Sequence, residues 1–123
     1  GLARCRVEGV ALPPGRQFGI HVHEKGDCSN NGMGAGGHFN PKGRPHSRHD
    51  APEHHAGDLP NLSSDGEGVA MLAFTTEELT VSPGPNSVVG RAVVVHESPD
   101  DYRTQPAGNS GARIACGVIR AAN

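Results

Sequence analysis

The stretch from His38 to Asp58 limits what this chain can fold into, because something other than a hydrophobic core must order it. It reads HFNPKGRPHSRHDAPEHHAGD, with few apolar side chains, and it also contains His46 and His55. Three imidazoles and one carboxylate form a tetrahedral shell that suits zinc, and metal binding can order a loop of glycine, proline and charged residues. We therefore predict a metal-bound loop here.

A second group of histidines lies outside this stretch. In the run FGIHVHE, the alternation of side chains along a strand would send His21 and His23 to one face and Val22 to the other. His96 ends the β-branched run VVGRAVVVHE much later in the chain. Together with the residues of the long stretch, these histidines bring the possible ligands to seven, which is enough for two metal ions.

Two further histidines, His49 and His54, lie within the long stretch but outside the ligand spacing. Because they do not share that spacing, we expect both to face solvent. A displaced zinc site that uses one of them is the alternative interpretation.

The composition favours short strands joined by long loops. The 123 residues include 18 glycines and 10 prolines, and 34% of the chain is hydrophobic. A chain of this length forms one domain, residues 1–123, with a modest core. The expected strands cover residues 4–12, 17–24, a short run after Asp58, 69–75, 88–96 and 112–119, while 79–81 is a brief turn of helix or extended chain. With about six strands and no convincing helix, the fold class is all-β, either a sandwich or a barrel.

Charge and cysteine content restrict the partners and the compartment. A net charge of −2 gives no reason to expect a nucleic acid or an anionic membrane as a partner. No apolar run is long enough to span a bilayer and no leader is recognisable, so we expect a soluble, already processed protein. Cys28 and Cys116 could form a bridge or remain separate reduced thiols, and Cys5 would be free or available to a second chain. A structural disulfide would indicate an oxidising compartment.

Six motifs together carry a resemblance to a known family. They are GIHVHEKGDC, AGGHFNP, HAGDLPN, VVGRAVVVHE, DDY and GNSGARIACGVI, together with the spacing of His46, His55 and Asp58. The chain resembles a copper/zinc superoxide dismutase of the bacterial kind over nearly all of residues 18–119. The resemblance implies a Greek-key β-barrel or sandwich with long metal-binding and electrostatic loops.

The resemblance also implies roles for individual residues. Copper would be bound by His21, His23, His38 and His96, and zinc by His38, His46, His55 and Asp58, with His38 bridging the two ions as an imidazolate. Asp100 would join a copper histidine to a zinc histidine, and Arg113 would attract and orient superoxide at the mouth of the channel. Cys28 and Cys116 would form the disulfide of the family.

The implied activity is the disproportionation of superoxide to dioxygen and hydrogen peroxide. Copper would alternate between Cu(II) and Cu(I), zinc would be structural, and His38 would act as both ligand and proton carrier. Two rival functions are a copper- and zinc-binding protein for storage or delivery with little turnover, and a module in which zinc only staples the fold. A zinc hydrolase is disfavoured, because a closed zinc shell leaves no position for an activated water.

The chain departs from the family pattern at its N-terminal side. Family members carry two further strands before the region that resembles ARCRVEGVALPPGRQFGIHVH, and the sequence lacks them. Their absence would leave strand edges and core side chains uncovered near Cys5. Either another subunit covers them, as in the homodimer or other homo-oligomer that we expect, or the barrel is only marginally stable. The disulfide that the resemblance implies would favour a periplasmic or secreted location.

Overall fold

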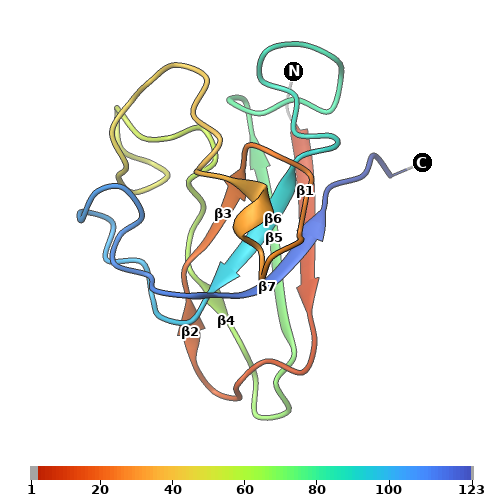
Figure 1. Cartoon of the computed structure of the whole chain (residues 1–123), viewed down its shortest axis with the longest axis vertical. Helices are drawn as coiled ribbons and strands as arrows, with labels where there is room; N and C mark the ends of the chain where they lie inside the picture. Colours follow the sequence, from red (N-terminus) through yellow and green to blue (C-terminus); the bar gives the residue numbers. More distant parts are fainter. Residues whose placement is uncertain (1–2, 123) are drawn as a thin grey trace.

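The computed structural model describes residues 3–122 and consists of short strands joined by long loops (Figure 1). The strands predicted at 4–12, 69–75 and 112–119 are present with shifted ends as β1, β5 and β7, and the all-β expectation is confirmed. Within the described residues, no helix is long and apolar enough to cross a bilayer. The elements in chain order are β1 (Ala3–Gly9), β2 (Gln17–Phe18), β3 (Ile20–His23), the 3-10 turn η1 (Met33–Ala35), β4 (Leu62–Ser63), β5 (Ala70–Thr76), β6 (Ala92–His96) and β7 (Arg113–Val118).

The strands of residues 3–122 form three small antiparallel sheets. β1 pairs with β5, β2 pairs with β4, and β6 lies between β3 and β7. Figure 1 shows two long loops, residues 38–58 in yellow and residues 97–112 in blue, on the same side of these sheets. Most of the residues with candidate metal-binding roles therefore gather on that side.

The expected strand 17–24 divides at Gly19, so the described residues contain seven strands rather than about six. Gly19 donates its N–H to the carbonyl of Ser98 at 2.8 Å, and its own carbonyl accepts the N–H of His96 at 2.8 Å. A Cβ on Gly19 would overlap the hydroxyl of Ser110, so only glycine permits this close approach. The chain passes from one sheet to the next at this point.

β6 is shorter than the predicted strand 88–96, because the first four residues of that run form a turn. The N–H of Arg91 bonds to the carbonyl of Val88 at 3.0 Å, and Gly90 has a φ of 84°. The guanidinium carbon of Arg91 then lies 3.9 Å from the centroid of the Phe39 ring. This cation–π contact ties the turn to the start of the 38–58 loop.

β3 is buried on both faces, which explains how it can carry two histidines. Ile20 and Val22 belong to the main hydrophobic core, together with residues such as Leu62. The alternate residues His21 and His23 point to the opposite face and are 0% and 1% exposed. Loops cover that face and make it a polar interior.

A smaller apolar cluster lies on the same face of the sheet as the histidines. Ala35, Ala92 and Val94 are buried together, and Cys28 and Cys116 pack against them. The predicted Cys28–Cys116 disulfide is present and links residues that are 88 positions apart. It fastens the loop around η1 to the edge strand β7.

An open groove separates β1 from β7. Among residues 3–122, β1 pairs only with β5 and β7 only with β6, so each has one free edge. The groove has a volume of about 520 Å³ and is lined by apolar side chains, including Val7, Phe74 and Ile119, and by Cys5, whose thiol is free. In this part of the chain, strand edges and core side chains are uncovered near Cys5, as expected.

Candidate metal centre

Backbone contacts bring the 38–58 loop alongside β3. Phe39 donates its N–H to the carbonyl of Val22 at 2.7 Å, and Val22 donates to the carbonyl of Gly57 at 2.9 Å. Gly57 in turn donates to the carbonyl of Phe39 at 2.9 Å, which joins the two ends of the loop. A Cβ on Gly57 would overlap the Val22 carbonyl, so glycine is required here. The first and last residues of the loop are thereby held beside the histidines of β3.

One set of side chains, which we call the four-histidine group, brings imidazoles from three segments together. The donor atoms of its members all lie within 4.8 Å of one another, and the members are His21, His23, His38 and His96. His23 donates Nδ1–H to the carbonyl of Gly36 at 2.8 Å, and His96 donates Nδ1–H to that of Gly111 at 3.1 Å. The Nε2 atoms of these two rings face each other at 3.4 Å. Two lone pairs directed at each other are typical of ligands that share an ion.

Two buried nitrogens of the four-histidine group have no hydrogen-bond partner among the described residues. They are Nδ1 of His21 and Nε2 of His38. The other nitrogen of each ring is engaged, in His21 by Asp100 at 2.7 Å and in His38 by His55 at 2.9 Å. A buried nitrogen without a partner is costly, and one metal ion in this group would satisfy both atoms. The residues therefore fit a bound metal.

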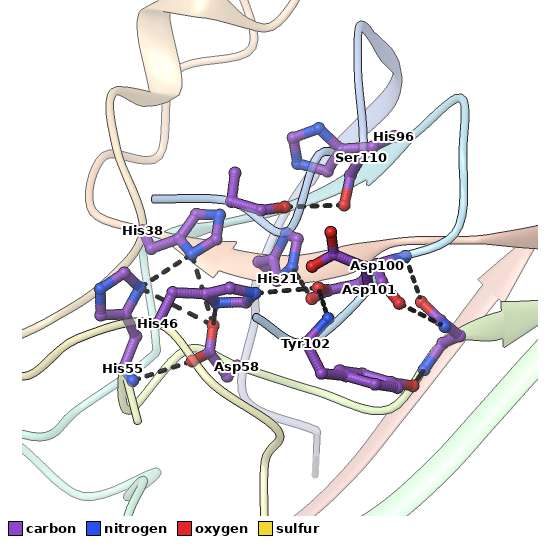
Figure 2. Close-up of polar contacts among 12 residues, drawn as sticks. His21, His38, His46, His55, Asp58, His96, Asp100, Asp101, Tyr102 and Ser110 are labelled. Atoms are coloured by element: carbon purple, nitrogen blue, oxygen red, sulfur yellow. Dashed lines mark hydrogen bonds and ion pairs between the residues drawn. The ribbon is translucent and has the colours of Figure 1, made fainter. Parts of the chain in front are cut away.

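A second set of donors lies around Nδ1 of His38. We call it the zinc-side group, and its members are His38, His46, His55 and Asp58. Nδ1 of His38 lies 2.9 Å from Nδ1 of His55 and 3.4 Å from Oδ1 of Asp58. Nδ1 of His46 lies 2.7 Å from that same oxygen. Figure 2 shows these side chains arranged around Asp58. Three imidazole nitrogens and one carboxylate oxygen form the donor set that suits zinc.

Membership of His55 in the zinc-side group rests on its contacts. The four donors within 4.8 Å of one another on this side are His21, His38, His46 and Asp58. His21 is near because its ring stacks on His38 with centroids 3.9 Å apart, but Asp100 occupies its Nε2, and its Nδ1, unpartnered among residues 3–122, is the atom left for the four-histidine group. His55 presents one nitrogen both to His38 and, at 3.7 Å, to Asp58. His55 is therefore the better placed fourth donor.

Backbone donors orient Asp58. Its Oδ2 accepts the N–H of His55 at 2.8 Å and that of Ser47 at 3.2 Å, which leaves Oδ1 facing the imidazoles. Burial by itself would raise the pKa of Asp58, but hydrogen bonds from His38 and His46 lower it well below its ordinary value. The carboxylate of Asp58 is therefore an anionic donor at neutral pH.

One further buried carboxylate connects the two groups. Asp100 accepts hydrogen bonds from Nε2 of His21 at 2.7 Å and from Nε2 of His46 at 2.9 Å. It also accepts the N–H of Tyr102 at 2.7 Å. Burial alone would raise the pKa of Asp100, but the bonds from both histidines lower it well below its ordinary value. The charged carboxylate thus holds each ring by the nitrogen that is not needed for a metal.

Burial sets the charge of three members of the four-histidine group, His21, His23 and His96. It lowers the pKa of His21 to about 4 and that of His23 to about 3, and it also lowers the pKa of His96. These imidazoles are neutral near pH 7 and can bind a metal without first losing a proton. Burial also opposes charging of His46, but its bonds to two carboxylates raise its pKa to about 9.

Arg113 begins β7 next to the four-histidine group. Its Nη1 donates to the carbonyl of Gly32 at 2.8 Å, in the loop that carries η1. Besides burial, the positive charge of Arg113 lowers the pKa of His23 and of His96, so its field reaches both rings. The side chain belongs to a partly exposed residue, which allows it to meet an anion from solvent.

The prediction that His54 faces solvent is wrong. The residue is 3% exposed, and its Nδ1 donates to the carbonyl of His55 at 2.6 Å. Its Nε2 lies 3.0 Å from a carboxylate oxygen of Glu78. His54 thus fastens the loop next to a candidate zinc ligand. His49 is only partly exposed, and its Nδ1 is buried without a partner among residues 3–122.

Sequence reasoning missed three residues that hold the loops together. Asn61, Tyr102 and Gln105 contact backbone groups of distant segments through their side chains. The Tyr102 hydroxyl accepts the N–H of Asn61 at 3.0 Å. The motifs DDY and HAGDLPN contain Tyr102 and Asn61, but no local pattern marks Gln105. Their partners are far away in the chain, where spacing rules do not reach.

Comparisons with known proteins identify the family. Residues 2–119 match the family described as copper/zinc superoxide dismutase (SODC). The chain belongs to this family. Superoxide dismutase (Cu-Zn) 2 of Aquifex aeolicus (strain VF5) is 39% identical over 120 residues, which cover 94% of this chain and 70% of that relative. Membership makes the protein an oxidoreductase of the superoxide dismutase class, with copper and zinc as its metals.

Two solved structures have the same fold. The clock protein EA4 matches with a TM-score of 0.84 at 39% identity, covering 96% of this chain and 78% of that one. A double mutant of a SOD-like protein from Bacillus subtilis matches with a TM-score of 0.85 at 38% identity, covering 96% and 80%. Both support the fold class that the six motifs implied.

The metal-free protein should lose stability in mild acid. Folding lowers the pKa of His21 and His23 from 6.5 to about 4 and about 3. The unfolded state therefore binds more protons in this range, so stability that is present above pH 6.5 falls as the pH drops toward these values. His21 alone contributes on the order of 3 kcal/mol. Urea unfolding at a series of pH values from neutral to mildly acidic measures the loss.

The opposite sign applies to His46, whose contribution changes on the alkaline side of that series. Its pKa is raised to about 9, so its contribution is present below pH 6.5 and is lost as the pH rises toward 9. A free energy of unfolding that stays constant from neutral to mildly acidic pH would contradict the prediction for the four-histidine group.

Proposed function

We propose that this chain disproportionates superoxide to dioxygen and hydrogen peroxide at a copper and zinc centre. The observation that carries the proposal is that buried Nδ1 of His21 and buried Nε2 of His38, unpartnered among the described residues, belong to one group of converging donors. A purely structural cluster would pair these nitrogens. The copper ligands would be His21, His23, His38 and His96, and the zinc ligands His38, His46, His55 and Asp58.

His38 would carry a proton in the reaction. Copper, when bound, would supply one-electron chemistry, because it cycles between Cu(II) and Cu(I) with imidazole ligands. The balanced reaction converts two superoxide ions and two protons to one dioxygen and one hydrogen peroxide. Nε2 of His38 faces the four-histidine group while its Nδ1 faces the zinc-side group, which supports the role. His38 would hold the proton at Nε2 and deliver it to the reduced oxygen species.

The zinc-side group would be structural. Its four donors fill a tetrahedral shell and leave no position for a reacting water. His46 is held from behind by Asp100, and Asp58 by two backbone N–H groups, so the ligands are oriented before any ion arrives. The group would keep the loop folded and hold His38 in place.

Arg113 would attract superoxide to the four-histidine group. The chain carries a net charge of −2, so an anionic substrate needs a local positive field. The charge of Arg113 already acts on His23 and His96, and the residue is reachable from solvent. These observations support a steering and orienting role.

The rival candidate is a copper- and zinc-binding protein of the same fold with little turnover. The similar solved structures carry the names clock protein EA4 and SOD-like protein. Neither name calls its protein a superoxide dismutase, so we retain this candidate. We favour the enzyme because Arg113 accompanies a complete donor set. A binding protein would have no use for a partly exposed cation whose charge acts on His23 and His96.

We place the active protein, as one domain of residues 1–123, in the periplasm or outside the cell. The Cys28–Cys116 disulfide supports this location, because such bonds persist in oxidising compartments and are rare in the cytosol. The bond fastens the loop whose Gly32 carbonyl holds Arg113. Oxidation would therefore also keep the steering residue in position.

A homodimer formed through β1 is the assembly that we propose. The edge of β1 that is unpaired among residues 3–122 can pair with the β1 edge of a second copy about a two-fold axis at Val7. Antiparallel pairing would then set Arg6 opposite the partner's Glu8, and Glu8 opposite the partner's Arg6. Arg6, Val7 and Glu8 all lie in β1. Opposite charges that face each other across an antiparallel pair attract. The added strand would cover part of the groove.

Metal content and turnover measured on one sample test the proposed activity. Protein loaded with both metals should hold about one copper and about one zinc per chain and should consume superoxide rapidly. Full metal with negligible turnover would establish the binding protein instead. Zinc without copper would indicate a module that zinc only staples.

Replacement Arg113→Ala should lower kcat/KM by about tenfold at low ionic strength and should weaken its dependence on salt, with metal content unchanged. Arg113→Lys should keep most of the rate, because it retains the charge. Arg120→Ala is a matched control, since Arg120 lines the groove between β1 and β7 instead. Rates of superoxide decay at several salt concentrations measure the effect. Equal rates for Arg113→Ala and Arg120→Ala would refute the steering role.

Charge changes on β1 test the dimer. Glu8→Arg should shift the mass in solution from dimer to monomer, because it would face the partner's Arg6. The double change Arg6→Glu with Glu8→Arg should restore the dimer. Val7→Asp should also give monomer, by placing two carboxylates opposite each other at the two-fold axis. Sedimentation measures the mass, and a monomeric parent protein would already exclude this assembly.

A further inference from the structure

Gln105 makes an unusual pair of contacts with a candidate zinc ligand. Its Oε1 accepts the backbone N–H of His46 at 2.7 Å, and its Nε2 donates to the backbone carbonyl of His46 at 2.6 Å. The amide therefore binds both polar groups of one residue, as a neighbouring strand would in a sheet. Gln105 and His46 are 59 positions apart and lie in the two long loops.

His46 is consequently engaged on every side. Its Nδ1 faces Asp58 at 2.7 Å, its Nε2 is bound by Asp100 at 2.9 Å, and the amide of Gln105 holds its backbone. The ring has one orientation in which both carboxylate contacts form. Any rotation of the backbone at His46 would move the ring away from at least one carboxylate.

The same kind of contact fixes the other end of the His46–Asp100 bond. Asn61 accepts the backbone N–H of Asp100 at 2.9 Å and donates to its carbonyl at 3.2 Å. Gln105 reaches from the 97–112 loop to the 38–58 loop, whereas Asn61 reaches the 97–112 loop from just beyond the 38–58 loop. The amide side chains of Gln105 and Asn61 thus connect the two loops on either side of the hydrogen bond between His46 and Asp100.

We propose that Gln105 is a positioning residue for the zinc-side group. Its amide holds the His46 ring between Asp58 and Asp100 before zinc binds. The proposal rests on the zinc ligands assigned under the proposed function. Loops without regular secondary structure lose much conformational entropy on ordering, and a clamp present before binding removes part of that cost from the binding step. Partners that orient metal-binding histidines typically change metal affinity by about 10- to 100-fold.

Because Gln105 is exposed, the effect of losing its contacts to His46 can be measured apart from any loss of core packing. The residue lies at the surface, so its substitution opens no cavity beneath the sheets. Its other contact, to the carbonyl of Arg103 at 3.2 Å, stays within its own loop. Loss of the clamp should therefore act on the zinc-side group and leave the stability of the hydrophobic core nearly unchanged.

Substitution Gln105→Met tests the proposal, because methionine has a similar length but cannot bond to the His46 backbone. The zinc dissociation constant, measured by competition with a chelator, should rise about tenfold. Cobalt bound in place of zinc should show an altered visible absorption spectrum, since His46 would be less well oriented. Gln17→Met is the matched control, because Gln17 is an exposed glutamine whose side chain makes only a 3.5 Å contact with Ser63. It should leave both measurements unchanged.

A second background separates positioning of His46 from general stiffening of the loops. In His46→Ala protein, the clamp has no ring to orient, so adding Gln105→Met should change the remaining zinc affinity by less than about twofold. The same tenfold loss in both backgrounds would overturn the proposal, and so would an unchanged dissociation constant in the single variant.

The outcome also distinguishes this proposal from the proposed function. A parent protein that binds zinc tightly and responds to Gln105→Met, but has no superoxide turnover, would support the clamp and refute the enzyme. Tight zinc binding with normal turnover and no response to Gln105→Met would overturn the clamp alone. A parent protein that binds no zinc would overturn both.

Discussion

The carboxylate of Asp100 bonds to one histidine on each side of the centre, and the arrangement of the site depends on that pair of contacts. Because it takes Nε2 of both His21 and His46, it leaves Nδ1 of His21 without a partner among the described residues and turns Nδ1 of His46 toward Asp58. A buried charge is costly unless it is well bonded, and Asp100 meets this condition through two imidazoles and the N–H of Tyr102. The residues that fix Asp100 therefore matter as much as the ligands themselves.

The two long loops have no sheet to order them, so other contacts must do so. The Cys28–Cys116 disulfide ties one neighbouring loop to β7, and glycine at position 57 lets the 38–58 loop approach β3 closely. Amide side chains take the place of a strand where the two long loops meet. This design makes the loops dependent on polar contacts, in which a single missing partner has consequences for the metal donors.

Several parts of the site could be predicted because they follow from local pattern. Alternation along β3 places His21 and His23 on one face, and the spacing of histidines in the 38–58 loop indicates a metal-binding segment. Predictions failed where distant partners decide the outcome. His54 is buried because Glu78, 24 positions away, pairs with it. The strand 17–24 divides because the 97–112 loop packs against its middle.

By itself, the sequence determined the all-β class, the family, the disulfide partners and which side chains are available as donors, because each of these depends on composition, alternation or motif. Only the tertiary structure decided which nitrogen of each ring is free. In a neutral imidazole, the nitrogen that donates to an acceptor carries the proton, and the second nitrogen is left free. The acceptors for His21, His23 and His96 come from segments that no spacing rule connects to these histidines. The clamp from Gln105 and the groove between β1 and β7 likewise arise from contacts between distant residues, which local sequence pattern does not encode.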